Sequence, residues 1–302
     1  MAPEALSTLQ PAVAQLLAAA GRSAHDFHLT PLSASGNNRV FVLATGSEQL
    51  VLKWYYHDPA DPRDRLGAEY AFAAHAWDSG LRCTPQPIAR DAARHLALYE
   101  YVAGTTLGPS AIDAAAVQQA ADFLARLNTE QSRASAQALP MASEACFSVA
   151  AHMAMVDARL ARFDDVGGMT PQSDVDREAA GFVATLRARW AAFKDALVTG
   201  CRALGVAPTA DLPASQRCLS PSDFGFHNAL VRPDGRFCFL DFEYAGWDDP
   251  AKTIGDFFAH PGVPVPRQHF DAFVGAVLAP FAEPAAMAAR ARLLEPVFQT
   301  KW

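Results

Sequence analysis

The chain has 302 residues, of which 51% are hydrophobic and 19% are charged. That composition is typical of a folded globular protein, and the length predicts two domains or one two-lobed unit. The 25 Lys and Arg residues against 32 Asp and Glu give a formal net charge of −7, which argues against a nucleic-acid-binding protein, since such proteins need clustered cations. No apolar run approaches the roughly 18 residues of a transmembrane helix, so no membrane span is expected.

Two further features predict a cytoplasmic location. The apolar stretch 12–20 resembles a secretory signal, but Glu4 stands where such a signal has a basic residue, and the leucine spacing predicts an amphipathic helix instead. The five cysteines are an odd number without a C-x-x-C pair, which predicts reduced thiols rather than a disulfide framework or a zinc site.

The first hundred residues show a strand pattern interrupted by one helix. Short runs rich in Val, Leu and aromatic residues predict strands over 27–32, 39–45, 49–55, 87–90 and 95–102. Before the fourth strand, Asp61 and Pro62 have the residue types of an N-cap and a first helical residue. The helix is expected to run from there to about Ser79, before Gly80.

From about residue 113 onward the apolar spacing becomes helical, and strand character returns only over 219–242. The sequence therefore predicts an α+β chain. A β-rich lobe is expected over 1–102, and a larger, mostly helical lobe with one late hairpin over 103–302.

That late hairpin carries the most informative spacing. Apolar runs on either side of Asp234-Gly235 predict a β-hairpin turn at this dipeptide. Folding about the turn is expected to bring Asn228 opposite Asp241 at the open end, with Asp223 on the loop that enters the hairpin.

These three side chains suit phosphoryl transfer. An amide oxygen and a carboxylate oxygen are ligands that Mg²⁺ accepts while it keeps positions for phosphate oxygens. A carboxylate that does not bind the metal can take the proton of an attacking hydroxyl. A single Asp of this kind is more often a turn or cap residue, but the three-part spacing favours the catalytic interpretation.

The motif resembles that of a known family. Asp223-x4-Asn228, followed thirteen residues later by Asp241-Phe, resembles the catalytic loop and metal-binding Asp of kinases, and the run Asp-Phe-Glu-Tyr-Ala-Gly resembles the aminoglycoside phosphotransferase/choline kinase family. The resemblance implies a protein-kinase-like two-lobed fold, with a small antiparallel sheet and one helix before a larger helical lobe. It implies transfer of phosphate from ATP or another NTP to a hydroxyl of a small molecule, with Asp223 as catalytic residue and Asn228 and Asp241 as Mg²⁺ ligands.

Other family features follow in the expected order. Gly36, Asn37 and Asn38 resemble the phosphate-covering loop between the first two strands, and Lys53 resembles the lysine that grips the nucleotide phosphates. Glu69 lies on the same side of its helix as the apolar residues, as the ion-pair partner of that lysine would.

The adenine site is expected at the end of the fifth strand. There Glu100 and Val102, which are followed by Gly104, resemble the hinge whose backbone groups bind adenine. A plain buried strand that ends at a glycine fits the same residues equally well.

Several departures from the family keep alternatives open. Pro221 and Ser222 stand where the family has His-Gly, and Asp256 is a candidate replacement for an Asp that the family has three residues earlier. The missing His-Gly leaves a regulatory pseudokinase open, and a nucleotidyl-transferase on the same lobes also remains. His227 is interpreted as a solvated loop histidine, with a phosphate contact as the alternative.

No motif names the acceptor or the oligomeric state. Glu243, Asp248 and Asp249 follow the metal-binding Asp closely. They predict either an acidic cleft that attracts a cationic acceptor or a solvated acidic loop.

Overall fold

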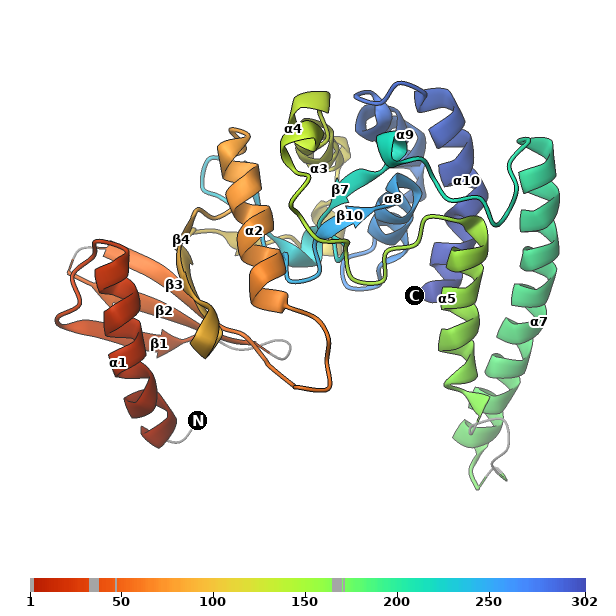
Figure 1. The fold of residues 1–302 in the computed structure, drawn as a ribbon. Coiled ribbons are helices and arrows are strands. Elements are labelled where there is room, and N and C mark those ends of the chain that lie inside the picture. The colour runs from red at the N-terminus through yellow and green to blue at the C-terminus, as the bar shows by residue number, and fades with distance from the viewer. Residues whose placement is uncertain (1–2, 33–37, 47, 165–169, 171) are drawn as a thin grey trace.

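The computed structural model describes residues 3–32, 38–46, 48–164, 170 and 172–302. Figure 1 shows the strands of the first hundred residues at one end of the molecule and the helices of the C-terminal part at the other. The arrangement is a mixed α+β, kinase-like one, as predicted.

The N-terminal lobe is built on a five-stranded sheet ordered β1-β2-β3-β5-β4, in which all neighbours are antiparallel. The strands are β1 (Phe27–Pro31), β2 (Arg39–Thr45), β3 (Glu48–Trp54), β4 (Pro87–Asp91) and β5 (Leu96–Glu100). Their bounds lie within about two residues of the predicted ones, because the alternation of buried and exposed residues was already visible in the sequence.

A helix covers each face of this sheet. Leu16 and Leu17 of α1 (Pro3–Ala19) pack with Leu52 of β3 on one face. On the other face Phe72 of α2 (Arg65–Asp78) shares a cluster with Tyr99 of β5. The amphipathic N-terminal helix was predicted, and it is α1. The lobe therefore contains two helices, α1 and α2, whereas the family resemblance implied one.

The start of α2 differs from the prediction. Asp64, not Asp61, is the N-cap, and its side chain accepts a hydrogen bond from the Gly67 N–H at 2.8 Å. Asp61 instead pairs with the guanidinium groups of Arg63 and Arg65. Both aspartates have a side chain that can cap a helix, but the carboxylate of Asp61 is bound by the two arginines, so Asp64 is the cap.

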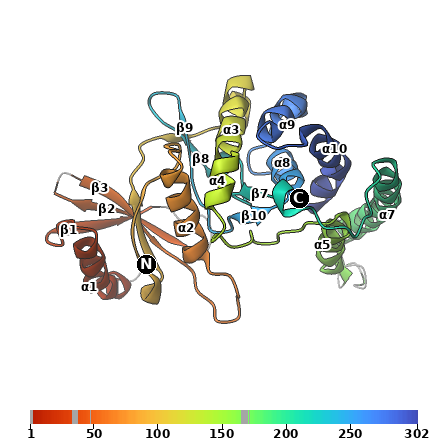
Figure 2. The same cartoon turned by 45° about the horizontal axis from the view of Figure 1, so that its top comes forward.

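The C-terminal lobe is mostly helical. Its helices are α3 (Ala114–Leu127), α4 (Glu130–Ser135), α5 (Val149–Ala161), α7 (Asp174–Ala203), α8 (Pro250–Ala259), α9 (Phe270–Leu278) and α10 (Pro284–Lys301). In Figures 1 and 2, α5 and α7 lie at the end farthest from the N-terminal sheet. None of the described helices is long and apolar enough to cross a membrane.

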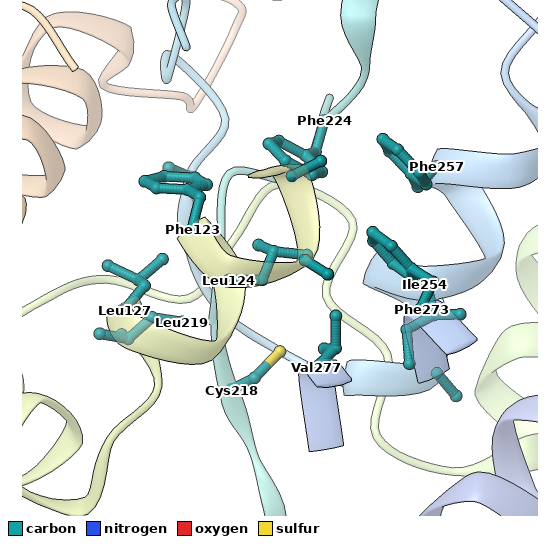
Figure 3. Packing of buried hydrophobic residues seen from close by; sticks show 14 of the residues in the cluster. Phe123, Leu124, Leu127, Cys218, Leu219, Phe224, Ile254, Phe257, Phe273 and Val277 are labelled. Carbon is teal, nitrogen blue, oxygen red and sulfur yellow. The ribbon is translucent and has the colours of Figure 1, made fainter. Parts of the chain in front are cut away.

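Aromatic packing joins the helices of this lobe to the segment that carries the predicted catalytic Asp. Figure 3 shows Phe224 between Phe123 of α3 and Phe257 of α8, with Phe273 of α9 below Phe257. The ring centroid of Phe224 lies 5.6 Å from that of Phe123 and 5.4 Å from that of Phe257. The residue that follows Asp223 is therefore anchored in the core, which limits the movement of the loop.

The predicted hairpin is confirmed, with a one-residue difference in register. β8 (Ala229–Val231) pairs with β9 (Phe237–Phe239), and β6 (Thr105–Thr106) adds a third, unpredicted strand. Asn228 is opposite Leu240, whose N–H donates to the Asn228 carbonyl at 2.8 Å. Asp241 follows with a φ of +64° and leaves the ladder at this point. A second pair, β7 (Cys218–Ser220) and β10 (Gly246–Asp248), flanks the segment that contains Asp223 and Asp241 on both sides.

Candidate active site

A cavity of about 430 Å³ lies between the N-terminal sheet and the hairpin. Its walls include the described residues that were predicted for nucleotide and metal: Asn38, Lys53, Glu69, Glu100, Val102, Asn228 and Asp241. Gly36 and Asn37 lie outside the described residues. The fold therefore brings together side chains that are up to about 200 residues apart in the chain.

Lys53 is held between two carboxylates. Leu50 and Leu52 of β3 point to α1, so the two-residue period of the strand turns Lys53 to the opposite face, toward α2. Its Nζ lies 2.6 Å from Oε2 of Glu69 and 2.5 Å from Oδ1 of Asp241. The predicted pair with Glu69 is formed, and Asp241 joins it from the C-terminal lobe.

Burial changes the acidity of this group of side chains. Burial alone would lower the pKa of Lys53, but the carboxylates of Glu69 and Asp241 raise that pKa well above its usual value. Burial raises the pKa of Glu69, although Lys53 opposes the change. The hydroxyl of Tyr55 donates to the same Glu69 oxygen at 2.8 Å, which fixes the carboxylate. The lysine is therefore a fixed positive charge at the wall of the cavity.

The loop before Asp223 is anchored to α8. Ser222 has a φ of +67°, a conformation that costs a non-glycine residue roughly 1 kcal/mol or more. Its N–H donates to Ser220 Oγ at 3.0 Å, and Lys252 Nζ of α8 lies 3.4 Å from Ser222 Oγ. The strained backbone beside Asp223 is thus fixed by side chains behind it, in a segment where the family has His-Gly.

Asp223 contacts the residues around it through both oxygens. The Nε2 of His227 lies 3.1 Å from Oδ1, and Nδ2 of Asn228 lies 3.5 Å from Oδ2 and 3.0 Å from the Asp223 carbonyl oxygen. Burial alone would raise the pKa of Asp223, but the hydrogen bond from His227 lowers it below its usual value, so the carboxylate is ionised at neutral pH. The interpretation of His227 as a solvated histidine is wrong, because its side chain is only 18% exposed and faces the carboxylate.

The described residues fit a magnesium ion. The amide nitrogen of Asn228 is used by Asp223, and Oδ1 of Asp241 is used by Lys53. Within the described ranges, no donor lies within hydrogen-bonding distance of Oδ1 of Asn228 or Oδ2 of Asp241. Both residues line the same cavity, and two such oxygens match the few hard ligands that Mg²⁺ takes from protein.

The predicted acidic cleft is absent from the described part of the chain. Glu243, Asp248 and Asp249 are all buried, and each carboxylate lies against a cation. Glu243 accepts from Arg65 at 3.0 Å and also from Asn38 at 2.5 Å. These acids join elements of the fold and do not offer a negative surface, which removes the sequence argument for a cationic acceptor.

Asp256 is also structural. It is 2% exposed, and both its oxygens accept hydrogen bonds from Lys301 at 2.9 Å. It therefore faces α10 and does not replace the family's Asp at the cleft.

A second, smaller cavity of about 200 Å³ is lined by Asp223. Its other lining residues come from loops and helices far apart in the chain: Arg63, Ser143, Glu144, Arg159, Ser222, Tyr244, Lys301 and Trp302. The sequence does not predict any of them as an acceptor residue, because they share no motif and no spacing. Asp223 lines this cavity, whereas its partners His227 and Asn228 line the larger one.

The sheet lobe, the helical lobe and the cavity between the sheet and the hairpin make up a kinase-like fold. A model of the APH phosphotransferase enzyme family matches residues 28–290, and the chain belongs to this family. The family consists of small-molecule phosphotransferases, so the chain is a small-molecule kinase. No curated protein sequence matches the chain.

Solved structures of low sequence identity share the fold. A choline kinase from Cryptosporidium parvum Iowa II has a TM-score of 0.65 at 11% identity, over 98% of this chain and 87% of that one. A choline/ethanolamine kinase family protein from Mesorhizobium loti has a TM-score of 0.55 at 22% identity, over 96% and 80%. Spectinomycin phosphotransferase APH(9)-Ia, in complex with ADP and spectinomycin, has 0.55 at 16% identity, over 88% and 79%.

Proposed function

We propose that this protein transfers the γ-phosphoryl group of ATP to a hydroxyl group of a small molecule, in a Mg²⁺-dependent reaction. The observation that carries the proposal is the position of Asp223. Asp223 lines the smaller cavity, while Asn228, Asp241 and Lys53 line the larger one, and the Asn228 amide nitrogen donates to the carbonyl and lies 3.5 Å from the carboxylate of Asp223. A hydroxyl compound in the first cavity and a nucleotide in the second would meet at this carboxylate.

Each side chain has a task in this proposal. Lys53, which Glu69 holds, would bind the nucleotide phosphates as a fixed cation. Asn228 and Asp241 would hold Mg²⁺, which neutralises charge on the phosphates when it is bound. Glu100 and Val102 line the cavity at the end of β5, where their backbone groups would bind adenine.

Asp223 would orient the acceptor hydroxyl and take its proton. As the acceptor oxygen bonds to phosphorus, the bond from phosphorus to the β-phosphate oxygen breaks, and ADP leaves with that electron pair. The hydroxyl proton moves to the Asp223 carboxylate and then to solvent. The lowered pKa of Asp223 makes it a weak base, which suits a transition state in which the proton moves late.

The experiment is a screen of hydroxyl compounds for ADP release, with amines, sugars, amino alcohols and aminoglycosides as separate groups. A true product gains about 80 Da, the mass of one phosphoryl group, and the Asp223→Asn variant serves as the blank. Addition of a nucleoside phosphate would identify a nucleotidyl-transferase instead. Tight ATP binding without any product across the screen would favour a pseudokinase.

We also propose that the protein works in the cytoplasm. All five cysteines are free thiols, three of them buried, which suits a reducing compartment.

A further inference from the structure

Two histidines converge on the carboxylate of Asp223. His227 lies on the loop just before Asn228, and His260 follows the last residue of α8. Their Nε2 atoms lie 3.1 Å and 3.5 Å from the same oxygen, Oδ1. The two rings are stacked, with centroids 3.8 Å apart and an interplanar angle of 12°. Asp223 thus meets a pair of imidazoles that come from two separate elements.

Such a cluster has the composition of a transition-metal site, and one potential ligand atom of each residue lies within 4.8 Å of the others. The hydrogen bonds argue against that use. Nδ1 of His260 accepts a hydrogen bond from the Gly262 N–H at 3.1 Å, so a neutral ring carries its proton on Nε2, toward Asp223. A metal-bound histidine has the opposite arrangement, in which the other ring nitrogen donates. The lone pair of an imidazole nitrogen lies in the plane of its ring. Two stacked imidazoles therefore direct their lone pairs along parallel planes and not toward one metal position.

His227 has the same tautomer for a different reason. Its Nδ1 is buried without a hydrogen-bond partner in the described part of the chain, and it lies against Gly225, where a Cβ would come within 2.7 Å. Only Nε2 has an acceptor, the Asp223 carboxylate. The absence of a side chain at Gly225 lets the ring approach the backbone so closely. Both histidines therefore carry the proton on Nε2, the ring nitrogen nearer to Oδ1, and His227 forms a hydrogen bond there while His260 makes a 3.5 Å contact.

His260 is the better fixed of the two rings. The indole of Trp302 packs edge-on against it, with centroids 4.3 Å apart at an angle of 67°. Trp302 is itself held by a hydrogen bond from Nε1 to Oδ1 of Asp256 at 2.9 Å. The backbone N–H of His260 donates a hydrogen bond to the Asp256 carbonyl at 2.9 Å, which ends α8. The ring is supported by the helix on one side and by an aromatic residue on another.

We propose that His260 is a positioning residue for the catalytic Asp223, a role that rests on the proposed function. Its Nε2 lies 3.5 Å from Oδ1 and its ring stacks on His227, so it contacts the carboxylate and holds the hydrogen-bonded His227 ring in place. Oδ1 faces both imidazoles, whereas Oδ2 has only the 3.5 Å contact with Asn228 and keeps a lone pair for an acceptor hydroxyl. The pair supplies the support that Pro221, which stands where the family has histidine, does not offer.

The first test compares His260→Ala with His260→Gln. Loss of the donor and of the stacked ring should lower kcat by a factor of roughly 5–30, while the KM for MgATP stays within about twofold, because the nucleotide residues are untouched. Glutamine carries an N–H donor of similar reach and should recover most of kcat. Equal losses in both variants, or a wild-type kcat in His260→Ala, would overturn the proposal.

A matched control comes from a second stacked pair in the chain. His57 and His95 stack with centroids 4.2 Å apart and an interplanar angle of 13°, in the N-terminal lobe. The His57→Ala variant removes one exposed ring of that pair and should leave kcat and KM unchanged. A loss as large as that of His260→Ala would mean that ring removal acts through general stability, which contradicts the proposal.

A second measurement does not depend on turnover. Long-range ¹H–¹⁵N NMR correlations distinguish the two tautomers of a neutral histidine, and burial lowers the pKa of His260, so the ring is neutral at neutral pH. We expect the Nε2–H form, and we expect the Nε2 resonance to shift in the Asp223→Asn variant. An Nδ1–H form, or an unchanged resonance, would overturn the proposal even in an active enzyme. The expected tautomer in a protein without turnover would instead refute the proposed function and leave the contact established.

Discussion

A double-mutant cycle on Lys53 and Glu69 tests the centre of the site. Glu69→Gln keeps an oxygen for the Tyr55 hydroxyl, which donates to Glu69 at 2.8 Å, so the change removes the charge with little loss of shape. Lys53→Ala removes the cation itself. The two side chains are 9% and 7% exposed, so their interaction is weakly screened by solvent.

The stability effect follows from burial. Removing one partner of a buried ion pair costs about 3–5 kcal/mol, since it leaves the other charge unpaired. Lys53 keeps Asp241 at 2.5 Å in the Glu69→Gln variant, which puts the cost at the lower end, about 3 kcal/mol. For a chain of this size that is a fall in Tm of roughly 5 °C. Differential scanning calorimetry measures it.

The effect on catalysis should be strongly non-additive. Loss of Lys53 should lower kcat/KM for ATP by roughly 10²-fold, because the phosphates lose their alignment. Loss of the Glu69 charge should cost about 10-fold, since it acts only through the position of Lys53. The double variant should then match Lys53→Ala alone, which is a coupling of about 1.4 kcal/mol.

The result that refutes this reasoning is a double variant whose kcat/KM falls by the product of the two single losses, roughly 10³-fold. Lys194→Ala is the control. Lys194 forms an ion pair with Asp157 at 2.9 Å, but these two side chains are 37% and 47% exposed, so the pair is at the surface. It should leave kcat/KM unchanged and lower the stability by less than about 1 kcal/mol.

Three further changes separate the roles of the carboxylates. Asp223→Asn should lower kcat by roughly 10²–10⁴-fold, while calorimetry finds little change in ATP affinity; a near-normal kcat would contradict a role in proton transfer. Asp241→Asn should make the remaining activity depend steeply on Mg²⁺, so a titration curve like that of the wild type would exclude it as a ligand. His152 and Arg290 lower the pKa of buried Asp249 despite its burial, so its contribution to stability is present above about pH 4 and is lost as the pH falls through the folded-state pKa. Asp249→Asn should therefore cost about 3 kcal/mol at neutral pH and flatten the acid limb of the stability curve, an outcome that equal acid sensitivity of both proteins would disprove.

Local patterns were legible in the sequence because their causes are local. The alternation in 39–45 reflects a strand with one face in the core, and that face is Phe41 and Leu43 packed under α1. The dipeptide Asp234-Gly235 predicted the hairpin since a glycine there takes a φ of +79° at no steric cost. The predicted proximity of Asp223, Asn228 and Asp241 has the same local cause, because a hairpin brings residues on either side of its turn close together in space.

Burial and partners were decided by the tertiary structure alone. Glu243 and Asp249 are ordinary acids in the sequence, and nothing near them predicts that Arg65 and Arg290 reach them from other elements. An acid is a surface charge or a structural ion pair according to whether a cation from a distant segment is buried against it. The sequence therefore could not tell an acidic cleft from a buried network.

The sequence by itself determined the element order, the sheet lobe followed by the helical lobe, and the group of Lys53, Asn228 and Asp241. Only the tertiary structure decided what surrounds Asp223. His260 reaches it from the end of α8, and Trp302 from beyond α10 supports that ring. Their separations in the chain follow no period and no motif, because they are set by how α8 and α10 pack against each other, and such packing depends on the whole core rather than on any one segment.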